Sequence, residues 1–445
     1  MENSNTFGIC TLANHVFELL TGTINVNATV IKINSENLSV NGELCFLTNL
    51  QAWKNFFTIE ASIYSKCTSI LEYLLHSRGQ TFQRGTNEEI AETVFRELVA
   101  ASAIWHLRIE KCTLQKERVC VFLNRSHAIS TAITMFVSNN VDIFKNQYSD
   151  KSFSLKVETD KESDLTNVRL CLIRDVAENL MKLQGCKISE TSNNKYIITS
   201  KSQSKTEDSY NRYVCGVVKN SEANAKEIKL TWELYLKEKK IKLSESFKQK
   251  CSTINEEINS VDDINSCLAQ AEIVFELLAV KPSRTVFIKS NTSSDRSVSN
   301  TKGVSFIFYN LARISAIWKK YITMQAAGRY PKLTDINNVD FSSLNQEEEW
   351  ELVYNFIIGY PDMIRSCIRY EPDFELYPQT LCHFLGRLCQ KFSAYYRRIR
   401  VLTEGGNHQV PAMTARLYLL KALDDILLGA LKVLHIRSVP SGFYM

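Results

Sequence analysis

The sequence predicts a mainly α-helical fold with a smaller α/β portion, ending in an all-α helical bundle. Two observations lead to this prediction. Strand-like runs are short and lie mostly before residue 271, whereas apolar residues recur every three or four positions in the longer segments. From residue 271 onward, five or six helical segments follow one another with short connections, which is typical of a bundle.

The chain has room for two or three domains at 445 residues. We expect an N-terminal α/β module at 1–145, a degenerate α/β region with exposed loops at 146–270, and a helical domain at 271–445. No apolar run is long enough to span a bilayer, and no signal or transit pattern begins the chain, so we expect no membrane contact. Thirteen cysteines occur singly, without a Cys-x-x-Cys pair, which favours reduced thiols and a cytoplasmic protein.

The N-terminal module alternates helical and strand-like patterns. Thr86 is a plausible N-cap, because Glu88 and Glu89 then lie in the first turn of the following helix, where the helix dipole favours acids. The elements are expected in this order: a helix at 14–23, a strand-like piece near 24–33, a helix at 65–79, the capped helix at 86–105, two strands joined by a charged turn at 106–126, and a helix at 128–139.

The middle region is richer in polar residues. The stretches 149–164 and 199–211 are dominated by Ser, Lys, Asn, Glu and Asp, which indicates exposed or partly disordered connections. The ordered elements expected here are an amphipathic helix at 167–185, strands at 194–200 and 212–220, and a charged helix at 230–250.

The helical domain carries most of the positive charge. Its helices are expected at 271–281, 303–328 and 344–359, then from Pro361 at a first helical position, and finally as two long helices between 376 and 445. From Leu376 to Met445 there are nine Lys and Arg residues against three acidic ones, a surplus of six, whereas the whole chain carries +5. The basic residues are therefore concentrated at this end.

No motif of a common catalytic site is found in the sequence. It has no Gly-x-x-x-x-Gly-Lys-[Ser/Thr] loop and no Gly-x-Gly-x-x-Gly turn, and no two of its seven histidines lie three or four residues apart. We therefore expect no catalytic residues, no metal ligands and no cofactor.

Aromatic residues alternate with the basic ones in the first of the two closing helices. That combination is typical of a surface that contacts the RNA backbone and stacks on bases. A structural alternative stays open, because Phe392 and one of Tyr395 and Tyr396 are needed for the core, and basic residues often serve only to solvate a helix face.

Four blocks give the helical domain a family resemblance. They are FIFYNLARISAIWKKY, EEEWELVYNFIIGYPDMI, LCHFLGRLCQKFSAYYRRIRVL and ARLYLLKALDDILLGALKVLHI. In order and spacing they resemble the C-terminal DALR-type anticodon-binding domain of arginyl-tRNA synthetases. A second stretch, NEEIAETVFRELV followed by VCVFLNR, is similar to the N-terminal appended domain of those enzymes.

The His-x-Gly-His signature of the synthetase core is missing, and the middle region is about half the size that such a core requires. The layout instead resembles the DALR anticodon-binding domain-containing protein 3 family. The resemblance implies a non-catalytic adaptor that recognises arginine tRNAs. It would hand them to a methyltransferase-like partner that forms 3-methylcytidine in the anticodon loop. We expect no DNA binding.

The resemblance also implies which residues contact RNA. Tyr309 and Arg313 match a tyrosine and an arginine one helical turn apart that face the anticodon, although Asn310 and Leu311 depart from the usual Tyr-Ala-His-Ala-Arg pattern. For Arg313 an ion pair within the bundle is the alternative. The other residues expected at the RNA surface are Lys391, Tyr396, Arg397, Arg398, Arg400, Arg416 and the terminal Met445.

Two other functions stay open at this point. One is a divergent arginyl-tRNA synthetase whose active site is unrecognisable. The other is a protein-interaction scaffold that has kept the helical bundle but lost RNA binding.

Overall fold

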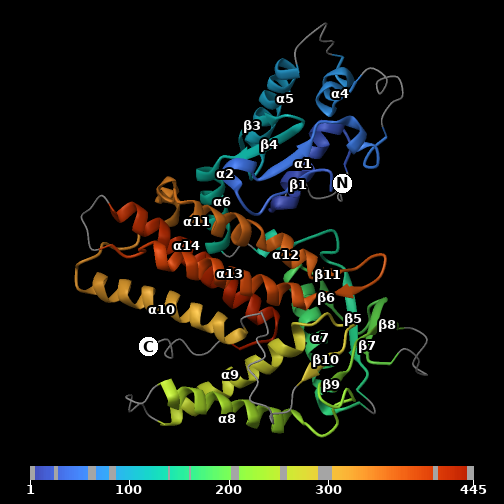
Figure 1. The fold of residues 1–445 in the computed structure, drawn as a ribbon, viewed down its shortest axis with the longest axis vertical. Coiled ribbons are helices and arrows are strands. Elements are labelled where there is room, and N and C mark those ends of the chain that lie inside the picture. The colour runs from blue at the N-terminus through green and yellow to red at the C-terminus, as the bar shows by residue number, and fades with distance from the viewer. Residues whose placement is uncertain are drawn as a thin grey trace. The chain divides into compact units, whose positions relative to one another are not determined.

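The computed structural model describes residues 6–24, 29–58, 67–79, 87–138, 141–159, 162–201, 210–250, 258–288, 303–403 and 409–437 (Figure 1). They form two compact units. Unit 1 comprises Met1–Ile143, Thr334–Asp362 and Gly405–Leu419, and unit 2 comprises Phe144–Leu333, Met363–Glu404 and Leu420–Met445. Each unit combines segments that are distant in the sequence. The three domains expected from the sequence, at 1–145, 146–270 and 271–445, stay a prediction.

Unit 1 is built on a four-stranded antiparallel sheet in the order β1-β2-β4-β3. Its strands are β1 (Lys32–Ile33), β2 (Leu44–Leu47), β3 (Ile109–Gln115) and β4 (Arg118–Leu123). The helices from the N-terminal part are α1 (Ile9–Thr21), α2 (Leu38–Asn41), α4 (Ile70–Ser77), α5 (Asn87–Ala101) and α6 (Arg125–Val137). The predicted hairpin and the predicted helices are confirmed, while Thr86 lies outside the described residues.

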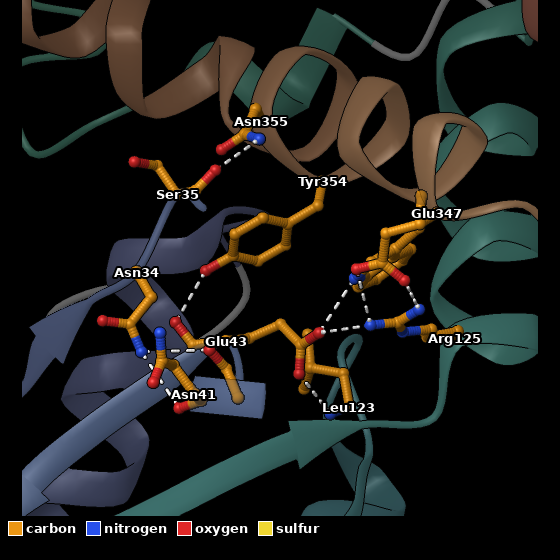
Figure 2. A network of polar contacts seen from close by, with 11 residues as sticks. Asn34, Ser35, Asn41, Glu43, Leu123, Arg125, Glu347, Tyr354 and Asn355 are labelled. Carbon is orange, nitrogen blue, oxygen red and sulfur yellow. Dashed lines mark hydrogen bonds and ion pairs between the residues drawn. The ribbon is translucent and has the colours of Figure 1, made fainter. Parts of the chain in front are cut away.

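The later part of unit 1 is α11 (Glu347–Leu352), which continues as a π-helical stretch, Val353–Ile358. A network of polar contacts joins this segment to the sheet and to the start of α6 (Figure 2). Trp350 donates a hydrogen bond from Nε1 to Glu43, and the Tyr354 hydroxyl donates to the Glu43 carbonyl. Arg125 forms a two-pronged ion pair with Glu347, at 2.6 and 3.2 Å. These contacts connect residues that are between 222 and 311 positions apart in the chain.

Unit 2 contains a parallel sheet in the order β6-β5-β7-β8. Its strands are β5 (Ser152–Val157), β6 (Lys187–Ile188), β7 (Asn194–Thr199) and β8 (Asn211–Val214), and α7 (Asp164–Leu183) packs against it. The prediction that 149–164 is an exposed connection is therefore wrong, because this stretch contains the interior strand β5. Pairing on both edges and burial of Phe153 outweigh its polar composition. Of the other polar stretch, 202–209 lie outside the described residues.

The long helices of unit 2 are α8 (Trp232–Lys250), α9 (Ile258–Leu278), α10 (Val304–Ala326) and α13 (Pro378–Arg398); α14 (Val410–Val433) contributes residues to both units. Short strands accompany them: β9 (Val218–Asn220) pairs in parallel with β10 (Val286–Ile288), and β11 (Ile368–Arg369) pairs with β12 (Glu375–Leu376). The predicted fold class is confirmed. Pro361 is the second residue of α12 (Tyr360–Ser366), one position later than expected.

A fully buried arginine holds α7 to its neighbours. The Arg169 guanidinium donates hydrogen bonds to five backbone carbonyls, those of Gly216, Leu277, Val280, Lys281 and Arg284. These carbonyls include the C-terminal end of α9, where helical carbonyls lack intrahelical partners. Across the described residues, every helix is too short or too polar to span a lipid bilayer.

Candidate functional site

The candidate site lies where α10 packs against α13. Most of the residues that α10 buries are apolar and follow helical spacing: Val304, Ile307, Phe308, Leu311, Ile314 and Ile317. This spacing leaves Tyr309 and Arg313, one turn apart, together on another side of the helix. On α13, Phe392 and Tyr395 are buried in the core, whereas Tyr396 is 38% exposed. Tyr396 is thus the tyrosine of this pair that remains available to a ligand.

Three of the predicted site residues come together here. The guanidinium carbon of Arg313 lies 4.2 Å from the centre of the Tyr309 ring and 4.8 Å from the centre of the Tyr396 ring. Arg313 also donates from Nη2 to the Tyr309 hydroxyl at 2.7 Å. Tyr309 is 52% exposed. We call Tyr309, Arg313 and Tyr396 the tyrosine–arginine cluster. It presents two aromatic rings and one cation at the surface.

Two buried polar residues support the cluster from below. Ser393 accepts a hydrogen bond from Arg313 Nη1 at 3.3 Å and donates one to Asn310 Oδ1 at 2.8 Å. Asn310 in turn donates to the Phe306 carbonyl at 2.8 Å. The sequence showed Asn310 only as a departure from a pattern, and it did not indicate Ser393. One indication does exist in the sequence. Asn310 and Ser393 are polar residues at positions that belong to the otherwise apolar, buried face of their helices.

The predicted alternative for Arg313, an ion pair within the bundle, is not what the structure shows. Among the described residues no carboxylate pairs with Arg313, and its partners are two rings and two hydroxyls. A guanidinium held over aromatic faces keeps its charge and gains about 0.5–1 kcal/mol per contact at an exposed site. Because the two rings hold it in one place, the cation is preorganised for an anionic ligand.

The remaining basic residues of this region lie along α13. Arg397 and Arg398 are in its last turn, and Arg400 follows two residues after its end; all three are exposed, and Lys391 is half-buried. They are at the same end of α13 as Tyr396. These positions suit contacts with a nucleic-acid backbone, and their role stays a prediction.

Arg416 is placed differently. It lies in unit 1, where its Nε donates to Glu349 Oε1 at 2.8 Å, and the Glu349 side chain is completely buried. Its guanidinium therefore has a structural role as the partner of a buried carboxylate, and an RNA contact of Arg416 stays a prediction. Met445 lies outside the described residues.

Two features of the described residues concern catalysis, namely the arrangement of possible metal ligands and the pKa of buried thiols. Within the described ranges, no cluster of three or more His, Cys, Asp or Glu side chains is arranged to hold a metal ion. Burial raises the pKa of Cys215 and of Cys389 to about 12, so these thiols stay protonated at neutral pH.

Comparison with known proteins places the cluster within a recognised domain. Residues 307–441 match the family model described as the DALR anticodon binding domain. The chain is 31% identical over 185 residues to DALR anticodon-binding domain-containing protein 3 of Danio rerio, covering 40% of this chain and 33% of that protein. The protein of the same name from Rattus norvegicus is 31% identical over 163 residues, covering 36% and 30%. The match thus spans about a third of these relatives' length.

A solved structure is similar over nearly the whole chain. The arginyl-tRNA synthetase of Plasmodium falciparum aligns with a TM-score of 0.58 and 10% identity, covering 98% of this chain and 99% of that one. At this identity the likeness concerns the fold alone. The predicted resemblance in sequence and the predicted fold are confirmed, and all three residues of the tyrosine–arginine cluster fall inside the matched domain.

Proposed function

We propose that the surface formed by α10 and α13 binds the anticodon region of tRNA, with arginine tRNAs as the preferred ligands. The observation that carries the proposal is the position of Arg313 between Tyr309 and Tyr396. The match of residues 307–441 to an anticodon-binding domain supports it.

The cluster offers the interactions that single-stranded loops require. Unstacked anticodon bases can stack on the exposed parts of the two tyrosine rings, each stack contributing about 1–3 kcal/mol. Arg313 uses two of its five N–H donors on protein hydroxyls, and the others can reach a base edge or a phosphate. The exposed arginines at the end of α13 add positive charge for the backbone.

The finer part of the proposal is an adaptor role. In it the protein is a non-catalytic, cytoplasmic cofactor that presents arginine tRNA to a methyltransferase-like enzyme, which forms 3-methylcytidine in the anticodon loop. This part rests on the resemblance of the four helical blocks to the DALR anticodon-binding domain-containing protein 3 family. Affinity purification, with sequencing of bound tRNA and identification of bound protein, tests it directly.

The binding proposal is tested with Arg313→Ala and Arg313→Lys, measured against the anticodon arm of an arginine tRNA. A hydrogen bond to a charged group contributes ~1.5–3 kcal/mol and tenfold in affinity is about 1.4 kcal/mol, so Arg313→Ala should weaken binding about tenfold or more. Arg313→Lys keeps the charge but loses the planar fork, and should fall between. The control is Lys182→Ala, which removes an exposed charge on α7 that pairs with Glu178.

Unchanged affinity of Arg313→Ala at matched salt would contradict the proposal, as would equal binding of arginine and non-arginine arms, which fits a scaffold instead. Because the fold resembles a synthetase over almost its whole length, aminoacylation is the competing enzymatic function. Robust arginine-dependent exchange of pyrophosphate into ATP would favour it over the adaptor.

A further inference from the structure

The parallel sheet of unit 2 has a face rich in lysine. Residues that pair across parallel strands point to the same side, and every second residue of a strand does so as well. Ser154 pairs with Lys195, Lys156 pairs with Ile197, and Ser152 pairs with Lys187. The three lysines therefore share one side of the sheet, to which β5, β6 and β7 each contribute one. We call Lys156, Lys187 and Lys195, with Tyr210, the basic face.

The opposite side of this sheet carries aromatic contacts to another segment of unit 2. Phe153 lies 5.1 Å from Tyr370 between ring centres, and Tyr196 stacks on Phe374 at 4.3 Å. Both belong to the opposite set of strand positions. Segment 370–376 thus packs on the apolar side, whereas Lys156 and Lys187 on the basic face are exposed and Lys195 is half-buried.

Tyr210 organises the lysines. The Lys156 Nζ lies 4.7 Å and the Lys195 Nζ 5.7 Å from the centre of its ring. Its hydroxyl hydrogen-bonds with Ser154 and with Lys156, and these bonds lower the pKa of Tyr210. One aromatic ring is therefore in contact with two ammonium groups. Fixing long side chains in advance reduces the entropy lost when they bind a ligand.

The carboxylate at the edge of this face has basic partners other than Lys187 and Lys195. Glu158, at the end of β5 on the same side, pairs with Arg212 at 3.1 Å and with Lys201 at 3.6 Å. In the part of the chain that the structure describes, neither Lys187 nor Lys195 pairs with an acid. A lysine-rich, polar surface differs from a protein interface, where lysine is depleted and aromatic anchors dominate. It suits phosphate, which lysine binds as a point charge.

We propose that the basic face binds the sugar–phosphate backbone of tRNA outside the anticodon arm. The inference rests on the proposed tRNA binding by the tyrosine–arginine cluster and assigns a role to the sheet of unit 2. Since the Tyr210 ring already contacts two ammonium groups, we expect phosphates rather than stacked bases as the ligands of this face. Its contribution to affinity is therefore independent of sequence and dependent on salt.

The test compares full-length arginine tRNA with its isolated anticodon arm. The double variant Lys156→Ala/Lys195→Ala should bind the full tRNA roughly tenfold more weakly at about 0.1 M salt. Two lost phosphate contacts should reduce the slope of log affinity against log salt by about 1.4–1.8. Affinity for the arm should be unchanged. Tyr210→Leu keeps both charges but frees the lysines, and should give a smaller loss. Lys182→Ala is the matched control for one removed exposed charge.

The inference is overturned if the double variant binds full-length tRNA with unchanged affinity and unchanged salt slope. If tRNA binding is unchanged but a co-purified protein is lost, the face belongs to a protein partner and the inference is again wrong. Failure of the proposed function looks different. In that case Arg313→Ala has no effect on the anticodon arm, whatever the lysine variants do.

Discussion

The indole Nε1 of Trp350 donates a hydrogen bond to Oε1 of Glu43 at 2.8 Å, although 307 positions separate the two residues. The Leu123 amide donates to the other oxygen at 2.8 Å, and Arg125 approaches to 3.8 Å (Figure 2). Glu43 is 1% exposed. A buried carboxylate with both oxygens hydrogen-bonded thus connects the residue just before β2 to α11 within unit 1.

Replacement of this carboxylate should destabilise unit 1. Glu43→Gln has nearly the same shape, but its amide nitrogen meets either the Trp350 or the Leu123 donor, which leaves one N–H without an acceptor. We expect a loss of about 1–3 kcal/mol in the free energy of unfolding, measured by urea denaturation. Glu36→Gln, an exposed carboxylate in the same part of the chain, is the control. A Gln variant as stable as the wild type would show that the network contributes little.

The stability of the wild type relative to Glu43→Gln should depend on pH. Burial raises the pKa of Glu43 from 4.5, and the hydrogen bonds and Arg125 reduce the shift only in part. A raised pKa means that the folded state binds the proton more tightly than the unfolded state does. The stability that this proton contributes is therefore fully present below pH 4.5 and is lost as the pH rises through the pKa of Glu43 in the folded protein. The difference between the two proteins in unfolding free energy should therefore shrink as the pH rises above 4.5. A difference that grows with pH would contradict this.

The sequence predicts a structural feature where neighbouring residues determine it, and it fails where distant segments determine it. The hairpin at 109–123 and the long helices can be predicted from the periodicity of their apolar residues. The four-residue spacing of Tyr309 and Arg313 likewise predicts that both lie on one face of a helix. The strand β5 could not be predicted, because its short alternation of apolar and polar residues lies among charged residues. The strand forms through parallel pairing with β6 and β7, which come later in the chain. The contact of Ser393 with Arg313 and the ion pair of Arg416 with Glu349 exist because particular helices pack together. A local sequence pattern does not show which helices pack together.

Arg169 should be far less replaceable than a neighbouring arginine on the same helix. Arg169→Met retains the apolar stem but removes the side-chain donor from five backbone carbonyls, of which that of Leu277 is fully buried. Because each unsatisfied buried group costs about 1–3 kcal/mol, we expect a loss of at least about 3 kcal/mol in urea unfolding. Arg174→Met is the control, since Arg174 is partly exposed and pairs with Asp175; a change within about 0.5 kcal/mol is expected there. Equal effects of the two would refute the carbonyl argument.

Substitutions of the two tyrosines of the cluster should weaken binding for different chemical reasons. Tyr309→Phe keeps the ring under Arg313 but removes the hydroxyl that accepts its hydrogen bond, whereas Tyr396→Leu removes a ring and keeps apolar bulk. If stacking dominates, Tyr396→Leu should weaken anticodon-arm binding by about 1–3 kcal/mol and Tyr396→Phe by much less. Tyr309→Phe should cost ~1 kcal/mol, because Arg313 loses one anchor but keeps Ser393. Fluorescence anisotropy with a labelled arm measures all three. Since Tyr396 is exposed, urea midpoints of its variants should stay near that of the wild type, and equal losses for Phe and Leu at position 396 would exclude stacking as the cause.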